Sequence, residues 1–184
     1  MSSHRLNVVR GFFLIASVCL VAACRPPAPP ATPAEVVHGF YVSYTGDFRG
    51  ADPAALAAGL RGAIASAVSI EERSRVAVAG SDFPSDKPQL IEGEIFSGLY
   101  EGFTGYQVGE GQTNGAAATV DVQFTNSHYS VAWTDRVQLV NENGWKIDDV
   151  RYLDKKAGAL GLRDVLRDFE QGAARDPLLN PPRP

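Results

Sequence analysis

The second half of the chain alternates apolar and polar residues with a period of two, which is typical of strands that bury one face. The clearest case is the segment from Ala116 to Phe124, in which every second residue is apolar. Three further strands are predicted at residues 100–108, 129–139 and 145–152. Because only short turns separate the four strands, we expect an antiparallel meander.

The predicted turns lie at residues 110–115, 125–128 and 143–144. Asn143-Gly144 is the strongest hairpin signal, since both residues tolerate a positive φ. In the last strand the apolar register slips by one residue between Ile147 and Val150, at Asp148-Asp149. Such a slip predicts a β-bulge that bends the sheet.

The first half of the chain has a period near 3.6, which indicates amphipathic helices. One helix begins at Thr32-Pro33 and ends at Gly46, with an apolar face of Val36, Val37, Phe40, Tyr41 and Tyr44. A second begins at Asp52-Pro53, with a stripe of Leu56, Leu60, Ile64, Ala67 and Val68 and a solvated end at residues 71–75. A long loop at 80–93 follows, and a short C-terminal helix carries Leu162, Val165, Leu166 and Phe169. The predicted fold is α+β, with N-terminal helices packed on a curved four-stranded antiparallel sheet.

The first 24 residues combine two basic residues, an apolar run and a cysteine. Arg5 and Arg10 precede an uncharged apolar run, residues 11–23, which is too short to span a bilayer as a stable helix. Leu20-Val21-Ala22-Ala23-Cys24 resembles a lipobox, and the resemblance implies that Cys24 is acylated, with palmitate among its lipids, and becomes the mature N-terminus. The alternatives are an ordinary secretory signal cleaved near Ala23 and a non-cleaved anchor. Arg25, in place of aspartate, implies sorting to the outer membrane in lipoproteins of this kind.

The domain organisation follows from this reading. Residues 1–23 are the signal peptide, 24–34 the lipidated cysteine with a proline-rich tether, 35–172 one α+β domain, and 173–184 a loose proline-rich tail. Proline favours extended polyproline II, so the tether spans roughly 30 Å. We therefore expect a domain held on the periplasmic face of the outer membrane.

Charge and cysteine content narrow the function classes. Without residues 1–23 the chain carries 15 basic and 21 acidic residues, a net charge near −6, which argues against binding nucleic acid or a broad anionic lipid surface. Cys19 leaves with the signal peptide, so Cys24 is the only cysteine of the mature chain. No disulfide can form within the domain.

Catalytic and metal motifs are absent from the sequence. It contains no Gly-x-Ser-x-Gly elbow and no His-Glu-x-x-His helix, and the glycines at 109–115 do not have dinucleotide-binding spacing. We therefore predict no enzyme activity, no cofactor and no metal.

Asp135 is the residue that most invites a chemical role. It interrupts the apolar register of its strand and should point into the concave face of the sheet. A carboxylate buried there has a raised pKa and could act as a base, with Tyr41 or Tyr44 as proton donor. The alternative is a structural acceptor of hydrogen bonds.

The remaining candidates lie in the long loop and in two strands. The loop and the residues just after it carry four acids, Asp82, Asp86, Glu92 and Glu94. Three interpretations are open for them: a calcium cluster, a recognition surface for a basic partner, or a solvated loop. Trp133 and Trp145 either line a ligand cavity or belong to the core.

Four pieces of sequence suggest a family. They are Phe40-Tyr41 with Tyr44, residues 92–96, Trp133-Thr134-Asp135, and Gly144-Trp145-Lys146-Ile147-Asp148-Asp149-Val150. Together they resemble a group of bacterial lipoproteins of unknown function with a cystatin-like, cone-shaped fold, similar to the nuclear-transport-factor-2-like superfamily. Some members serve as immunity proteins that neutralise secreted toxins, lipases among them.

Three functional hypotheses follow. The first is a non-enzymatic, lipid-anchored periplasmic binding protein, most specifically an immunity protein against a secreted effector that attacks the envelope. The second is a carrier of a small apolar ligand or lipid inside the cone, and the third is an enzyme that uses Asp135. The tentative binding residues are Tyr41, Tyr44, Glu92, Glu94, Trp133 and Asp135.

Overall fold

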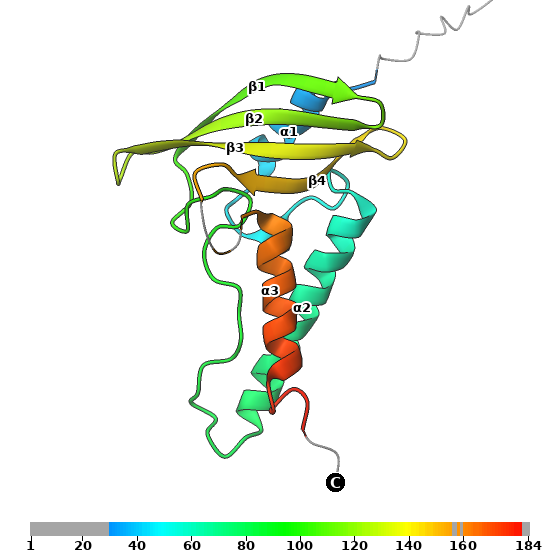
Figure 1. Cartoon of the computed structure of the whole chain (residues 1–184). Helices are drawn as coiled ribbons and strands as arrows, with labels where there is room; N and C mark the ends of the chain where they lie inside the picture. The colour runs from blue at the N-terminus through cyan, green and yellow to red at the C-terminus, as the bar shows by residue number, and fades with distance from the viewer. Residues whose placement is uncertain (1–29, 156–157, 159, 182–184) are drawn as a thin grey trace, which may run out of the picture.

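A computed structural model describes residues 30–181 except 156, 157 and 159. The signal peptide, Cys24 and most of the tether therefore lie outside the described residues. The described part is an α+β domain with three α-helices and one open four-stranded sheet (Figure 1). The helices are α1 (Pro33–Ser43), α2 (Ala58–Ala79) and α3 (Leu162–Arg175), with a 3-10 turn η1 (Phe48–Gly50). The strands are β1 (Gly105–Asn114), β2 (Ala117–Asn126), β3 (Val131–Asn141) and β4 (Trp145–Tyr152).

The sheet is the predicted antiparallel meander, in the order β1-β2-β3-β4. Gln138 pairs with Asp149 and Leu139 with Ile147, so Asp148 is the extra residue and the predicted β-bulge is confirmed. The hairpin at Asn143 is confirmed as well, since its φ is 57° and that of the following glycine is 123°.

The first strand lies further along the chain than predicted. Residues 110–114, expected in a turn, belong to β1, while residues 100–104 precede it. The turn needs only the residues around Gly115, whose φ is 61°, and a bulge between Val108 and Gly111 absorbs the irregular glycine spacing. β1 is an edge strand, so its polar residues remain solvated.

Helix α1 begins where the sequence predicts. Thr32 accepts a hydrogen bond from the Glu35 amide, the Glu35 carboxylate accepts one from the Thr32 amide at 2.7 Å, and Pro33 occupies the first turn. This capping box satisfies amide groups that the helix itself leaves free. The apolar face of α1 packs on the sheet, with Val37 and Phe40 buried.

Helix α2 differs from the prediction at both ends. Asp52 opens a turn instead of the helix, because Leu56 forms a short parallel bridge with Ile147 of β4 before the helix begins at Ala58. The helix then continues to Ala79, and Glu71 is fully buried where a solvated end was expected.

The helices form two groups. α1 lies against one face of the sheet, whereas α2 and α3 pack along each other and project away from the sheet beneath β4, with the loop after α2 running back beside them (Figure 1). Only the first of the two N-terminal helices therefore lies across the sheet as predicted. Within the described residues, no helix combines the length and apolar character needed to cross a membrane.

The core lies between α1 and the sheet and is rich in aromatic rings. Phe40, Tyr41, Phe103 and Phe124 form successive ring contacts at centroid distances of 4.9–5.7 Å. Both tryptophans pack against this core while half-buried.

The C-terminal helix extends past the predicted domain end at 172, to Arg175. The described part of the tail is held by hydrogen bonds: Asp176 accepts from the Leu178 amide at 2.8 Å and from the Gln89 side chain at 2.5 Å. Asn180 also donates to the Ala173 carbonyl oxygen at 2.8 Å, so side-chain hydrogen bonds join residues 176–180 to the end of α3 and to the long loop.

The close contact between α3 and β4 gives a stability prediction. A Cβ added at Gly161 would lie 2.8 Å from the Val150 carbonyl oxygen, whereas one added at Gly39 in α1 meets nothing within 4 Å. We expect Gly161→Ala to lower the free energy of unfolding by about 1–3 kcal/mol. Gly39→Ala, the matched control, raises it by up to about 1 kcal/mol, because alanine favours a helix.

Urea denaturation of the two variants, followed by tryptophan fluorescence, measures this difference. Equal stability of Gly161→Ala and Gly39→Ala would contradict the close approach.

Candidate functional site

The segment from Glu94 to Gly98, which we call the buried strap, runs through the core without helix or strand structure. Ile95, Phe96 and Ser97 are 0–3% exposed. A buried irregular segment lacks the hydrogen-bond ladder of a helix or strand, so its amide and carbonyl groups need partners elsewhere in the protein.

Two carboxylates accept hydrogen bonds from strap amides. The Glu94 carboxylate accepts from the Phe96 amide through Oε1, and Asp135 accepts from the Gly98 amide through Oδ2 at 2.6 Å. Two tyrosine hydroxyls donate to strap carbonyls: Tyr41 to Phe96 at 2.7 Å and Tyr152 to Ile95 at 2.6 Å. α1, β3 and β4 thus each contribute a side chain that holds the strap.

Asp135 occupies the position that its break in the register predicts, but its contacts are structural. It is 1% exposed, and its Oδ2 also accepts a hydrogen bond from the Trp133 indole at 2.9 Å. Its Oδ1 has no partner among the described residues. Burial raises the pKa of Asp135, against the lowering effect of these hydrogen bonds. A cavity of about 270 Å³ adjoins the carboxylate, and Leu99 and Lys155 also line it.

The tyrosines suggested as proton donors do not bond to Asp135. The Tyr41 hydroxyl donates to the strap, and the Tyr44 hydroxyl donates to Glu94 Oε1 at 3.0 Å. Burial raises the pKa of both tyrosines well above the ordinary value, and the nearby Glu94 carboxylate raises them further. The predicted site residues therefore separate into two pairs: Tyr44 with Glu94, and Trp133 with Asp135.

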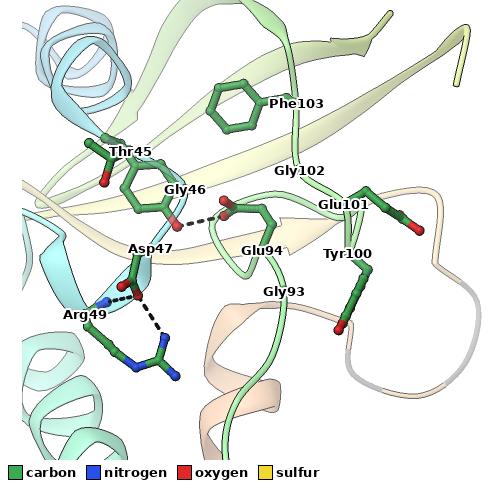
Figure 2. A pocket seen from close by; sticks show the side chains of 11 residues that line it. Thr45, Gly46, Asp47, Arg49, Gly93, Glu94, Tyr100, Glu101, Gly102 and Phe103 are labelled. Atoms are coloured by element: carbon green, nitrogen blue, oxygen red, sulfur yellow. Dashed lines mark hydrogen bonds and ion pairs between the residues drawn. The ribbon is translucent and has the colours of Figure 1, made fainter. Parts of the chain in front are cut away.

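A cleft of about 600 Å³, which we call the Glu94 cleft, opens between the turn after α1 and residues 93–103 (Figure 2). Glu94 lies in its wall with Phe103 on one side and Asp47 and Arg49 on the other. Burial raises the pKa of Glu94 to about 7, although hydrogen bonds from the Phe96 amide and the Tyr44 hydroxyl favour the ionised form. A half-ionised acid in an open cleft near pH 7 is typical of functional sites.

Arg49 borders the cleft, but its guanidinium forms ion pairs with acids other than Glu94. Its guanidinium binds both oxygens of Glu71, at 2.7 and 2.5 Å, and Asp47 at 2.9 Å. Glu71 also accepts a hydrogen bond from the Ile91 amide at 2.8 Å, so the pair anchors the long loop to α2. Sequence reasoning missed this role. Its signal is the helical spacing of Glu71 from Ile64 and Ala67, which places the acid on the buried stripe.

The other acids of the long loop do not gather into a site. Glu92 pairs with Lys87 at 2.8 Å on the surface, and Glu94 turns into the cleft. Among the described residues, no three His, Cys, Asp or Glu side chains lie close enough to hold a metal ion.

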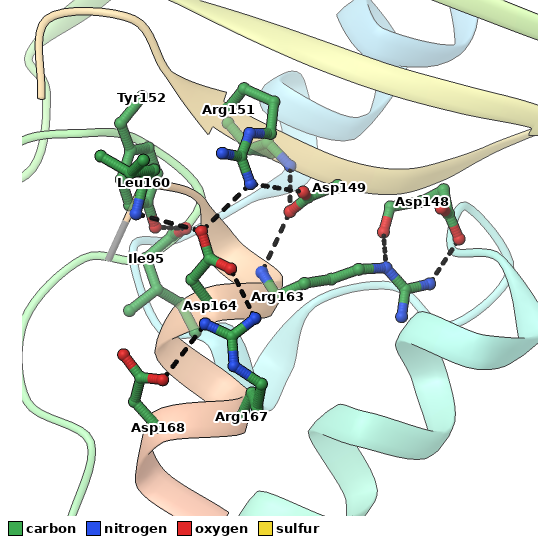
Figure 3. Close-up of polar contacts among 11 residues, drawn as sticks. Ile95, Asp148, Asp149, Arg151, Tyr152, Leu160, Arg163, Asp164, Arg167 and Asp168 are labelled. Atoms are coloured by element: carbon green, nitrogen blue, oxygen red, sulfur yellow. Dashed lines mark hydrogen bonds and ion pairs between the residues drawn. The ribbon is translucent and has the colours of Figure 1, made fainter. Parts of the chain in front are cut away.

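The motif from Gly144 to Val150 connects β4 to α3 (Figure 3). Helix α3 has no side-chain cap of its own, and Asp149 Oδ1 accepts a hydrogen bond from the Arg163 amide in its first turn at 3.0 Å. Asp148 pairs with the Arg163 guanidinium, and Arg151 pairs with Asp164 at 3.1 Å. The bulge directs the two consecutive acids to the same helix end, so this motif has a structural explanation.

Comparison with protein-family models, curated proteins and solved structures finds no match to this chain.

The raised pKa of Glu94 predicts a pH-dependent stability. The folded state holds this proton up to about pH 7, while the unfolded chain releases it near 4.5, so ionisation disfavours folding. We expect the free energy of unfolding to fall between pH 5 and pH 8, with a contribution from Glu94 on the order of 3 kcal/mol. Glu94→Gln keeps an acceptor for the Phe96 amide and flattens this fall.

Urea unfolding at pH 5, 6, 7 and 8 tests the expectation. Burial raises the pKa of Asp135 too. The free energy of unfolding therefore keeps some pH dependence in every variant that retains Asp135. Glu92→Gln, at an exposed acid two residues away, is the control and keeps the wild-type slope. An unchanged slope in Glu94→Gln contradicts the assignment.

Proposed function

We propose that this chain is a lipid-anchored, non-enzymatic binding protein on the periplasmic face of the bacterial outer membrane. The apolar run, the lipobox-like residues before Cys24 and Arg25 support the location. The observation that carries the binding role is the Glu94 cleft, whose volume of about 600 Å³ lies within the usual range of ligand sites.

The hydrogen bonds of the buried acids support a non-enzymatic role. A general base must reach a proton of the substrate. Oδ2 of Asp135 already accepts hydrogen bonds from the Gly98 amide and the Trp133 indole. The other oxygen, Oδ1, is shielded from solvent, although the carboxylate borders the cavity that Leu99 and Lys155 line. The carboxylate is thus arranged to hold the strap.

The aromatic core gives little support to a carrier of apolar ligands. Between α1 and the sheet, where such a ligand would lie, the rings of Phe40, Tyr41 and Phe124 are in mutual contact. The cavity beside Asp135 lies at the end of the strap and has both Asp154 and Lys155 in its wall.

Our specific proposal is an immunity protein that neutralises a secreted, envelope-attacking toxin, with a lipase as one candidate. The family resemblance supports it, as does a helix lying on a curved antiparallel sheet, which agrees with the cystatin-like and nuclear-transport-factor-2-like cone. The proline-rich tether supports it too, because a domain held roughly 30 Å from the bilayer can meet a toxin in the periplasm.

The anchor is tested by metabolic labelling with radioactive palmitate. We expect the full chain to incorporate label and to sediment with membranes, and Cys24→Ser to lose both properties because the acylated thiol is gone. Cys19→Ser, at the other cysteine, remains labelled. Label in Cys24→Ser would refute the lipobox.

The immunity role is tested by co-expression in the periplasm with a secreted hydrolase encoded next to this chain. We expect wild type to relieve toxicity, and Asp135→Asn to protect equally because the amide retains an oxygen acceptor for the Gly98 amide. Absence of protection when both proteins reach the periplasm contradicts the proposal. Protection that requires the Asp135 carboxylate, in a variant folded as shown by circular dichroism, favours the enzyme.

A further inference from the structure

The Glu94 cleft has an excess of negative charge. Asp47, Glu94 and Glu101 line it, and Arg49 is the basic residue in its wall. The Arg49 guanidinium binds Asp47 and the buried Glu71, so Glu94 and Glu101 supply the excess negative charge of the wall. The cleft therefore presents a negative potential to any solute that enters it.

The two carboxylate oxygens of Glu94 differ in their contacts. The residue is 8% exposed, and the hydrogen bonds from the Phe96 amide and the Tyr44 hydroxyl both go to Oε1, which leaves Oε2 free to meet a donor in the cleft. The carboxylate lies in the cleft wall (Figure 2). A carboxylate oxygen at a cleft wall accepts hydrogen bonds from donors that enter, and a positively charged donor gives the strongest bond.

Aromatic side chains complete the lining. Tyr44, Tyr100 and Phe103 border the cleft together with the acid. Aromatic faces attract organic cations, and a carboxylate beside them fixes the N–H groups. A bare divalent metal ion fits less well, because no three metal-binding side chains gather in the described part of the chain.

We propose that the Glu94 cleft binds an alkylammonium or guanidinium group, with Glu94 Oε2 as the acceptor and the aromatic rings beside the alkyl chain. This inference rests on the proposed function, since it takes the cleft as the binding site. The group is either a lysine or arginine side chain of the partner protein or a free organic amine.

The full chain, purified in detergent, is titrated at pH 8 by calorimetry and NMR. The probes are N-acetyl-lysinamide, N-acetyl-argininamide, putrescine and two neutral analogues, N-acetyl-norleucinamide and N-acetyl-citrullinamide. We expect saturable binding of cationic probes, at least tenfold weaker binding of the neutral ones, and at least a tenfold loss in Glu94→Gln. Glu110→Gln, at an exposed acid of β1 outside the cleft lining, binds as wild type does.

The probes also separate the two sources of the cation. Tighter binding of the blocked amino acids assigns the site to a protein side chain, and tighter binding of putrescine assigns it to a free amine. No saturable binding, or equal binding by Glu94→Gln, overturns the inference. The co-expression assay reports separately on the proposed function: protection without cation binding refutes only the cation site, and cation binding without protection refutes only the immunity role.

Discussion

The fold depends on the hydrogen bonds that hold the buried strap. Glu94, Asp135, Tyr41 and Tyr152 satisfy two amides and two carbonyls in a segment that has no ladder or helix to do so. Each buried group left without a partner would cost about 1–3 kcal/mol, which is large beside the 5–15 kcal/mol that separates folded from unfolded domains. Because Phe96 of the strap contacts Phe40 of α1, the packing of that helix on the sheet depends on the same bonds.

Glu94 contacts both the buried strap and the cleft. Glu94 holds the strap with one oxygen and faces the cleft with the other, so the burial that makes it a good structural acceptor also raises its pKa. Ionisation of the buried Glu94 destabilises the folded state, and a cation beside the carboxylate favours the ionised form and offsets that cost. In the cation site that we propose, stability and recognition are therefore linked at this single carboxylate.

Local patterns predicted the parts of the fold that depend on near neighbours. The alternation in β2, the helix start at Thr32-Pro33 and the bulge at Asp148 can be read from adjacent residues, because pleat, cap and register are local properties. Asp52-Pro53 misled the prediction of α2, since the bridge between Leu56 and Ile147 joins segments about ninety residues apart. The acids Glu71 and Glu94 are alike in this respect: nothing in their own sequence neighbourhood shows that Arg49 or Tyr44 lies beside them.

The strap has a kinetic consequence. Its hydrogen bonds to Tyr41, Asp135 and Tyr152 join residues 55, 37 and 57 positions apart, so all three are in place only once α1, β3 and β4 have each met the strap. Long-range contacts of this kind slow folding, because the chain must close large loops before it gains from them. The wall of the Glu94 cleft is part of the same segment, so the proposed binding surface exists only in the completed domain. An unfolded chain cannot present this surface to a ligand.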